Sequence, residues 1–352
     1  MTNKSVPPPP TRDDDKAPHA ISPLQARAGT AAVASAREAS EFATIFNEIV
    51  DNVGGAVLGK TQVVRLALTT LFAEGHLLLE DAPGTGKTIL AKSIAASIHG
   101  THNRIQFTPD LLPSDVTGVT IFDQKSGEFE FHKGPVFASV VLADEINRAS
   151  PKTQSALLEV MEESRVTVDG KTYDAGRPFL VMATQNPIEQ TGTYKLPEAQ
   201  LDRFLIKTSL GYPDRDSVIE ILAGSAQRDR TTNVKPIVTS QEIISLAGVA
   251  SRIYIDPAIA DYVARLAEET RNDPQTRVGV SVRGSIALVR CAKVWAAAQG
   301  RNYVIPDDVK ALAMPVLAHR LVIELEAEFD GVTSTDIMSR VLSAVAPPSA
   351  KK

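Results

Sequence analysis

Apolar positions change their period along the chain, and the changes predict where strands and helices lie. From Phe42 to Val53, apolar side chains recur at helical spacing and predict a packed helix. Short apolar runs then alternate with helical segments, and we expect these runs to be strands: 76–80, 104–107, 139–143, 179–183 and 204–209. Strands separated by helices are typical of βαβ units, so we predict an α/β fold with a mostly parallel sheet covered on both faces, an αβα sandwich.

Beyond Pro213 the strand pattern stops and helical periodicity continues alone. The expected helices are 214–227, 240–252, 257–271, 284–299 and 306–320. This change predicts a domain boundary, with a core of alternating strands and helices at 39–213, a linker and first helical segment at 214–235, and a smaller all-helical domain at 236–345. Residues 1–38 contain almost no large apolar side chains, so we expect a disordered Pro/Ala-rich tail there, and a frayed tail at 346–352.

Two segments of the alternating region are predicted to be hairpins inserted into the core. Residues 166–173 alternate around Asp169-Gly170, a pair that suits a tight type I′ turn. Residues 119–132 alternate in the same way around Ser126-Gly127 and carry several phenylalanines. Such protrusions are places where loops carry function, although the aromatic side chains there suit packing equally well.

Composition excludes several classes of protein. The chain has 352 residues and a formal charge of -5, which argues against a general binder of nucleic acid, because such affinity comes mainly from Lys and Arg. With one cysteine, Cys291, no intramolecular disulfide can form, and the six histidines show no spacing typical of a zinc site. No apolar run is long enough for an integral membrane segment, and the N-terminus lacks the apolar stretch of a secretory signal. We therefore expect a cytoplasmic protein.

A glycine-rich loop follows the first predicted strand and opens a predicted helix, which is the context that a phosphate-binding loop requires. Its glycines allow backbone N–H groups to turn towards phosphates, and the helix N-terminus adds partial positive charge. Lys87 would neutralise the β and γ phosphates of ATP, and the Thr88 hydroxyl would ligate Mg²⁺. Asp81 replaces the first glycine of the general pattern, at a position that starts the loop. The residues predicted to bind the nucleotide here are Pro83, Gly84, Thr85, Gly86, Lys87, Thr88 and Ile89.

Polar side chains also follow two of the other predicted strands. Asp144 and Glu145 end the strand at 139–143; Asp144 would hold Mg²⁺ through water, and Glu145 would orient and polarise the attacking water. Asn186 follows the strand at 179–183, where its amide would position the same water. Asn before a proline is also a common turn starter. Because ligands bind at the carboxyl edge of a parallel sheet, we expect these groups to meet at one site.

Together with their surroundings, these motifs resemble the MoxR branch of the AAA+ ATPases. The segments that carry the resemblance are 104–118 (RIQFTPDLLPSDVTG), 134–149 (GPVFASVVLADEINRA), 155–163 (SALLEVMEE), 182–187 (MATQNP) and 196–204 (LPEAQLDRF). The resemblance covers residues 42 to 342 and implies a P-loop core followed by a helical lid, assembled as a homo-oligomer, usually a ring of six with each nucleotide at a subunit interface. It also implies that the two hairpins are family insertions, which face the pore or client in related motors.

The resemblance assigns further residues to the site. It gives Asn186 the role of first sensor and makes Arg203 the arginine finger that reaches a neighbour's γ-phosphate, where an ion pair with Asp202 or Glu198 is the plainer alternative. Arg283 resembles the second sensor, which contacts the γ-phosphate and couples lid angle to nucleotide state. The family often has proline just before this arginine, whereas this chain has Val282. Val57 and Leu58 resemble the region that grips adenine.

The function that follows is a Mg-dependent ATPase that drives chaperone-like assembly, remodelling or metal-centre maturation of a protein client. MoxR-like ATPases are thought to work with proteins that carry a von Willebrand factor A domain, so we expect such a partner. A nucleic-acid motor and the motor subunit of a metal chelatase share related cores and stay open as alternatives. A nucleotide-gated binding module with little turnover is a third alternative, and the presence of Glu145 and Arg203 weighs against it.

Overall fold

The structure, a computed structural model, describes residues 32–82, 84–186, 193–224 and 229–349. Its centre is a five-stranded sheet with the order β2-β5-β8-β1-β9, in which every neighbouring pair is parallel. These strands are β1 (Leu77–Glu80), β2 (His102–Gln106), β5 (Val140–Asp144), β8 (Leu180–Gln185) and β9 (Ile206–Thr208). All five overlap the predicted strands, and the mixed α/β fold with a parallel central sheet is confirmed.

Helices cover both faces of this sheet because its strands alternate between two hydrophobic clusters. Leu77 and Leu79 pack with the helices on one face, whereas Leu78 packs with the long helix on the other face. The helices of the sheet region are α1 (Ala36–Gly54), α2 (Thr61–Phe72), α3 (Lys87–Ser97), α4 (Pro113–Thr117), α5 (Pro151–Glu163) and α6 (Glu198–Leu201), with a 3-10 turn at Ile146–Arg148. The first cluster continues into the helices beyond Pro213, so one hydrophobic core joins the two regions.

The region beyond Pro213 contains helices and one small pair of strands. Its helices are α7 (Arg215–Ala223), α8 (Ser240–Ser251), α9 (Pro257–Asn272), α10 (Val282–Ala297), α11 (Pro306–Leu317), α12 (Leu325–Phe329) and α13 (Ser334–Ala344), with 3-10 turns at Arg230–Asn233 and Ala318–Arg320. The helical lid is confirmed, but it is not all-helical. β10 (Thr276–Val278) and β11 (Val322–Ile323) form an antiparallel pair too short for alternation to reveal in the sequence. The predicted domain boundaries at 213 and 235 stay predictions.

Helix α1 begins inside the segment that the sequence predicted as a tail. Ser35 caps it by accepting a hydrogen bond from the Glu38 N–H, and the Glu38 carboxylate accepts from Ser35 in return. Arg252 fixes the same carboxylate from the lid at 2.7 Å, and Ala34 is buried. The folded part therefore starts several residues before Phe42, and a capping box of Ser and Glu was the signal for it. Residues 1–31 of the predicted tail and 350–352 at the other end lie outside the described residues.

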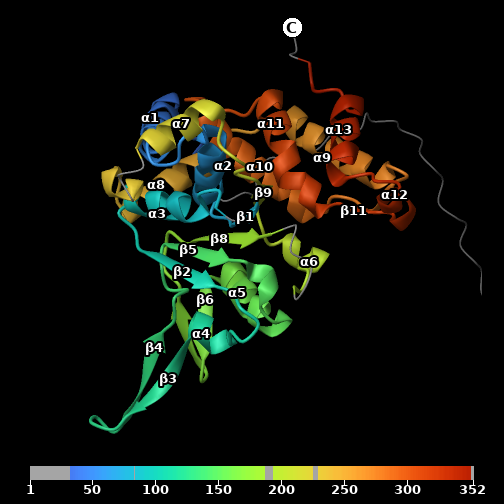
Figure 1. Cartoon of the computed structure of the whole chain (residues 1–352). Helices are drawn as coiled ribbons and strands as arrows, with labels where there is room; N and C mark the ends of the chain where they lie inside the picture. Colours follow the sequence, from blue (N-terminus) through green and yellow to red (C-terminus); the bar gives the residue numbers. More distant parts are fainter. Residues whose placement is uncertain (1–31, 83, 187–192, 225–228, 350–352) are drawn as a thin grey trace, which may run out of the picture. The chain divides into compact units, whose positions relative to one another are not determined.

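Both predicted hairpins are present. The first joins β3 (Gly118–Asp123) to β4 (Glu128–Lys133), and the second joins β6 (Arg165–Val168) to β7 (Lys171–Asp174). Figure 1 shows the β3–β4 hairpin extending well beyond the sheet. Phe122 and Phe129 are exposed near its end, whereas Phe131 stacks on Tyr173 of the second hairpin, with ring centroids 4.1 Å apart. The aromatic residues of this insertion are thus divided between packing and exposure.

Two buried histidines predict that the fold loses stability in acid. Burial lowers the pKa of His76 to about 4 and that of His319 to about 3, with Arg320 adding to the second shift. Above about pH 6.5 both states carry neutral histidine, so there is no effect. Below about pH 6.5 these histidines bind protons in the unfolded chain but stay neutral in the folded chain. Each histidine therefore lowers the free energy of unfolding by up to about 1.4 kcal/mol per pH unit, until the pH reaches its pKa in the folded state.

We therefore expect the melting temperature to fall between about pH 7 and 4. His76 donates to the Met161 carbonyl and accepts from the Val181 N–H, so His76→Gln should lower stability at neutral pH but flatten its dependence on pH. His132→Gln, at an exposed histidine, is the control and should leave the slope unchanged. A His76→Gln slope identical to that of wild type would contradict this account.

Candidate nucleotide-binding site

The phosphate-binding loop has the backbone that its glycines were expected to provide. Gly84 and Gly86 have φ values of +82° and +98°, and no atom lies within 4 Å of the place where a side chain would begin at either residue. Other residues rarely adopt such angles, so glycine is required at both positions. Helix α3 starts at Lys87, and its free N–H groups face the loop. Together these features form an open cradle for an anion at a helix N-terminus.

A cavity of about 380 Å³ lies over this loop and gathers most of the predicted residues. Residues from the ends of β1, β5 and β8 line it together, as expected where neighbouring parallel strands end at one edge. Its lining consists of Asp81, Gly84, Thr85, Gly86, Lys87, Thr88, Ile89, Arg104, Asp144, Glu145, Thr184 and Asn186. Pro83, also predicted to bind the nucleotide, lies outside the described residues.

Lys87 is held at the mouth of the loop by the loop itself. Its ammonium group donates to the carbonyl oxygens of Ala82 at 2.8 Å and Asp81 at 3.3 Å. The Asp81 carboxylate points the other way and accepts from the Ser209 hydroxyl and from the N–H groups of Leu210 and Gly211, at 2.6–2.8 Å. Asp81 thus ties the start of the loop to the chain after β9, which explains why an acidic residue stands at this position.

Asp144 and Glu145 are connected through Thr184, a residue to which the sequence assigned no role. The buried Thr184 hydroxyl donates to Asp144 Oδ1 at 2.7 Å and accepts from the Glu145 N–H at 2.9 Å. Glu145 has a left-handed backbone, with φ +57°, which is uncommon for a residue that is not glycine. Such conformations persist where surrounding contacts hold them, and they cluster at functional sites. Thr184 is one of those contacts.

In the described structure, side chains of the same chain bind the carboxylates of both Asp144 and Glu145. Arg104 forms an ion pair with Asp144, while Gln106 donates to Glu145 Oε2 at 2.9 Å and Arg148 approaches the same oxygen at 3.1 Å. Sequence reasoning missed Arg104 and Gln106, because their roles depend on β2 lying beside β5. It also missed Arg148, which follows Glu145 by three residues in the 3-10 turn. The only early signal was their position in the segments that carry the family resemblance.

The site suits a triphosphate with one divalent cation. The cradle and Lys87 present the positive groups that phosphates need, and Thr88 and Asp144 offer the hydroxyl and carboxylate oxygens that Mg²⁺ prefers. Among the described residues no cluster of three or more His, Cys, Asp or Glu side chains is placed to hold a metal by itself.

Arg203 and Arg283 do not line this cavity. Arg203 donates to the Leu158 carbonyl at 2.7 Å and pairs with Glu162 at 3.1 Å, and Arg283 reaches the same Glu162 carboxylate at 3.5 Å. The alternative partners expected for Arg203 are engaged elsewhere, since Asp202 pairs with Arg283 and Arg320, and Glu198 pairs with Arg277. The two arginines therefore form a second cluster with Glu162, separate from the loop.

Val57 and Leu58, the predicted adenine contacts, also lie outside the cavity lining. Val57 is buried, and Gly59 and Lys60 beside it approach the chain after β9. Lys60 donates to the Tyr212 carbonyl at 2.6 Å. The structure thus places this turn next to the segment that leads into α7, and a role in adenine binding stays a prediction.

The hydroxyl of Thr184 allows a direct test of the site. Thr184→Val keeps the shape of the side chain but removes the bridge between Asp144 and the Glu145 backbone, so we expect the turnover of ATP to fall about 10- to 100-fold, as for other partners that orient metal ligands. Steady-state ATPase assays over a range of Mg²⁺ concentrations measure the effect. Thr184→Ser should retain most activity, and equal rates for Thr184→Val and wild type would show that the bridge has no role.

Two family profiles match the chain in the order of its folded regions. Residues 76–206 match the "ATPase family associated with various cellular activities (AAA)", and residues 268–341 match the "AAA lid domain". The first range contains the phosphate-binding loop and both carboxylates, and the second contains Arg283. Fold, site and profiles together define a P-loop ATPase of the AAA+ class.

Similar proteins narrow the class further. The chain is 42% identical to "Chaperone MoxR1" of Mycobacterium tuberculosis, covering 88% of this chain and 84% of that protein, and 33% identical to "Protein MoxR" of Paracoccus denitrificans, covering 80% and 90%. A crystal structure of an ATPase candidate from Cytophaga hutchinsonii superposes with a TM-score of 0.83 at 38% identity, covering 89% of this chain and 98% of that one. The chain belongs to the MoxR family of AAA+ ATPases.

Proposed function

We propose that this chain hydrolyses ATP in a Mg-dependent reaction, as one subunit of a hexameric ring. The observation that carries the proposal is the cavity that joins Lys87 and Thr88 to Asp144, Glu145 and Asn186. Thr88 and Asp144 would hold a magnesium ion, which would supply charge neutralisation at the phosphates. Glu145 polarises the attacking water, and the Asn186 amide orients it.

The arginine cluster supports the ring. Arg203 and Arg283 carry the positive charge that a γ-phosphate needs in the transition state, yet both face Glu162 rather than the cavity of their own chain. In a ring of identical subunits joined head to tail, one surface of each subunit meets a different surface of the next. We propose that this brings the two arginines to the neighbour's nucleotide, so that each site is shared.

The proposed ring uses the energy of ATP hydrolysis for a chaperone-like function. We propose that the ring assembles or remodels a protein client, including maturation of a metal centre, together with a partner that has a von Willebrand factor A domain. The exposed Phe122 and Phe129 of the β3–β4 hairpin suit contact with such a client. We propose the cytoplasm as the location; none of the helices in the described ranges is long and apolar enough to cross a bilayer.

Titration calorimetry with ATP tests whether the chain binds the nucleotide, on which the rest of the proposal depends. Lys87→Ala removes the ammonium group that neutralises the phosphates, so heat of binding seen with wild type should disappear at the same nucleotide concentration. Lys92→Ala is a matched control on the same helix, since Lys92 faces Asp229 at 3.8 Å and does not line the cavity. Absence of binding heat in wild type at millimolar nucleotide would overturn the proposal.

A further inference from the structure

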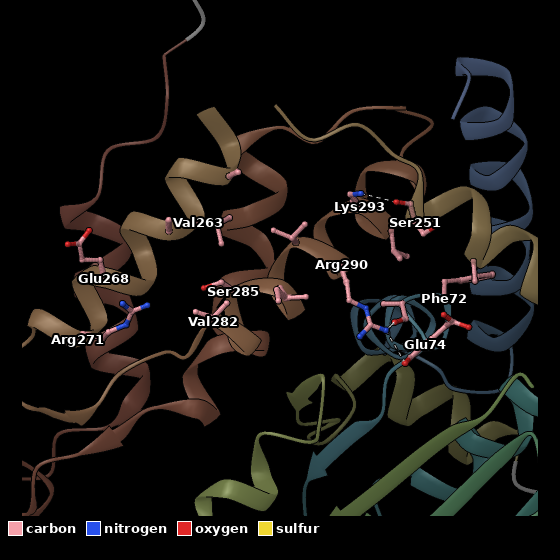
Figure 2. A pocket seen from close by; sticks show the side chains of 17 residues that line it. Phe72, Glu74, Ser251, Val263, Glu268, Arg271, Val282, Ser285, Arg290 and Lys293 are labelled. Atoms are coloured by element: carbon pink, nitrogen blue, oxygen red, sulfur yellow. Dashed lines mark hydrogen bonds between the residues drawn. The ribbon is translucent and has the colours of Figure 1, made fainter. Parts of the chain in front are cut away.

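An apolar groove with a volume of about 640 Å³ lies in the lid, away from the nucleotide site. Figure 2 shows it running along α10, with Glu268 and Arg271 of α9 at one end, Phe72 of α2 at the other, and Val282, Ser285, Arg290 and Lys293 between them. Val282 and Ile286 are 70% and 56% exposed on its wall. An apolar surface of this kind marks a site where another molecule packs.

The rim of the groove carries positive charge that the chain itself does not neutralise. Arg271 donates to the Val280 carbonyl, Arg290 to those of Ala73 and Glu74, and Lys293 to that of Ser251. Among the described residues, none of these cations has a carboxylate within ion-pair distance, and burial lowers the pKa of Lys293. The rim also holds two carboxylates, Glu74 and Glu268, of which Glu74 faces Arg177 at 3.5 Å. An acidic partner would complement the rim.

Helix α7 is complementary to this groove, because it exposes apolar side chains and carries acidic residues. It buries none of its residues in the described part of the chain, although Ile219 and Leu222 are large, apolar and 54% and 65% exposed. Val218 and Ile221 are exposed as well. Asp216 and Glu220 lie one helical turn apart on the same helix and, within the described residues, form no ion pair. A helix with an apolar face and acidic residues therefore matches the apolar wall and the cationic rim of the groove.

The two surfaces lie beside the two halves of the proposed shared site. The start of α7 follows the segment 209–211, which the Asp81 carboxylate at the start of the phosphate-binding loop holds at 2.6–2.8 Å. At the other half, Val282 of the groove directly precedes Arg283, which lies with Arg203 on Glu162. A ring that brings these arginines to the next subunit's phosphates would turn the groove towards the side where the neighbour's α7 stands.

We propose that α7 of one subunit lies in the lid groove of the adjacent subunit and joins the ring there. Ile219 and Leu222 supply apolar anchors at helical spacing, as in other interfaces where a helix fills a groove. Asp216 and Glu220 meet the rim cations. The contact is heterologous, so each subunit uses its α7 once and its groove once, which is the arrangement that closes a ring. This inference rests on the proposed ring and names the surfaces that form it.

Cross-linking between two different variants tests this contact in the full-length protein. Leu222→Cys and Ile286→Cys are prepared separately, mixed with ATP and Mg²⁺, and treated with a short bis-maleimide reagent. We expect a cross-linked dimer only in the mixture, since the native Cys291 is fully buried and burial raises its pKa to about 12. Leu222→Cys mixed with Phe329→Cys, at an exposed position of α12, is the control and should give none.

Sedimentation velocity supplies the second measurement. Leu222→Asp and Ile286→Asp should each raise the concentration needed for assembly by about tenfold, while ATP binding by the isolated subunit stays as in wild type. Glu220→Lys should weaken assembly, and adding Lys293→Glu in the same chain should restore part of it. A ring that forms normally in all these variants, with no cross-link, overturns this interface and leaves the ATPase proposal standing. A wild-type chain that binds ATP but never assembles overturns the ring and the interface together.

Discussion

Arg203→Ala should reduce the turnover of ATP by about 10³- to 10⁵-fold, the range seen when an arginine that acts from a neighbouring molecule is lost. Binding of ATP to the same variant should stay close to wild type, because Arg203 does not line the nucleotide cavity of its own chain. Steady-state hydrolysis and calorimetry measure the two quantities separately. A variant that lost both together would place Arg203 in its own chain's site.

Mixing two inactive variants makes the test specific to a shared site. Lys87→Ala subunits bind no nucleotide but still carry Arg203, whereas Arg203→Ala subunits keep an intact loop. In an equal mixture, about a quarter of the interfaces of a head-to-tail ring combine an intact loop with an intact arginine, and activity should return in that proportion. Arg277→Ala is the control, since Arg277 pairs with Glu198 nearby and lines no part of the cavity. A mixture no more active than its components would contradict the shared site.

The sequence predicted the nucleotide loop because the chemistry of that loop is local. Gly84, Gly86, Lys87 and Thr88 are adjacent in the chain, and the strand and helix that flank them have clear periods. The central sheet followed from the same periodicity. The small β10–β11 pair did not, because strands of three and two residues are too short to alternate, and their pairing depends on the lid helices.

The contacts that hold Glu145 could not be read in this way. Thr184 and Gln106 reach Glu145 from strands on either side of β5, so their roles appear only when the strand order is known. Similarly, the place of Arg283 depends on how the lid packs against α5, which carries Glu162. The motifs in the sequence indicated the chemical role of Glu145 and Arg283. Their hydrogen-bond and ion-pair partners depend on tertiary packing, which the sequence pattern does not give.

Glu145→Gln should separate binding from hydrolysis. The amide cannot polarise water as the carboxylate does, so we expect turnover to fall by about 10²- to 10⁴-fold, the contribution typical of a general base. The side chain keeps its size and its Oε atom can still accept from Gln106 and Arg148, which hold Glu145 at 2.9 Å and 3.1 Å. The loop and the affinity for ATP should therefore be preserved, and the ATP-bound state should accumulate.

A trapped state of this kind should hold its partners. A tagged Glu145→Gln protein, incubated with ATP and Mg²⁺ and recovered from cell extract, should retain the client and the von Willebrand factor A partner that wild type releases after hydrolysis. Glu328→Gln, at an exposed glutamate of α12, is the matched control and should behave as wild type in both assays. Gln106 tests the geometry, because its hydrogen bond at 2.9 Å orients the Glu145 carboxylate. Gln106→Ala should then leave ATP binding intact and change the rate, whereas a full wild-type rate in Glu145→Gln would remove this residue from the reaction.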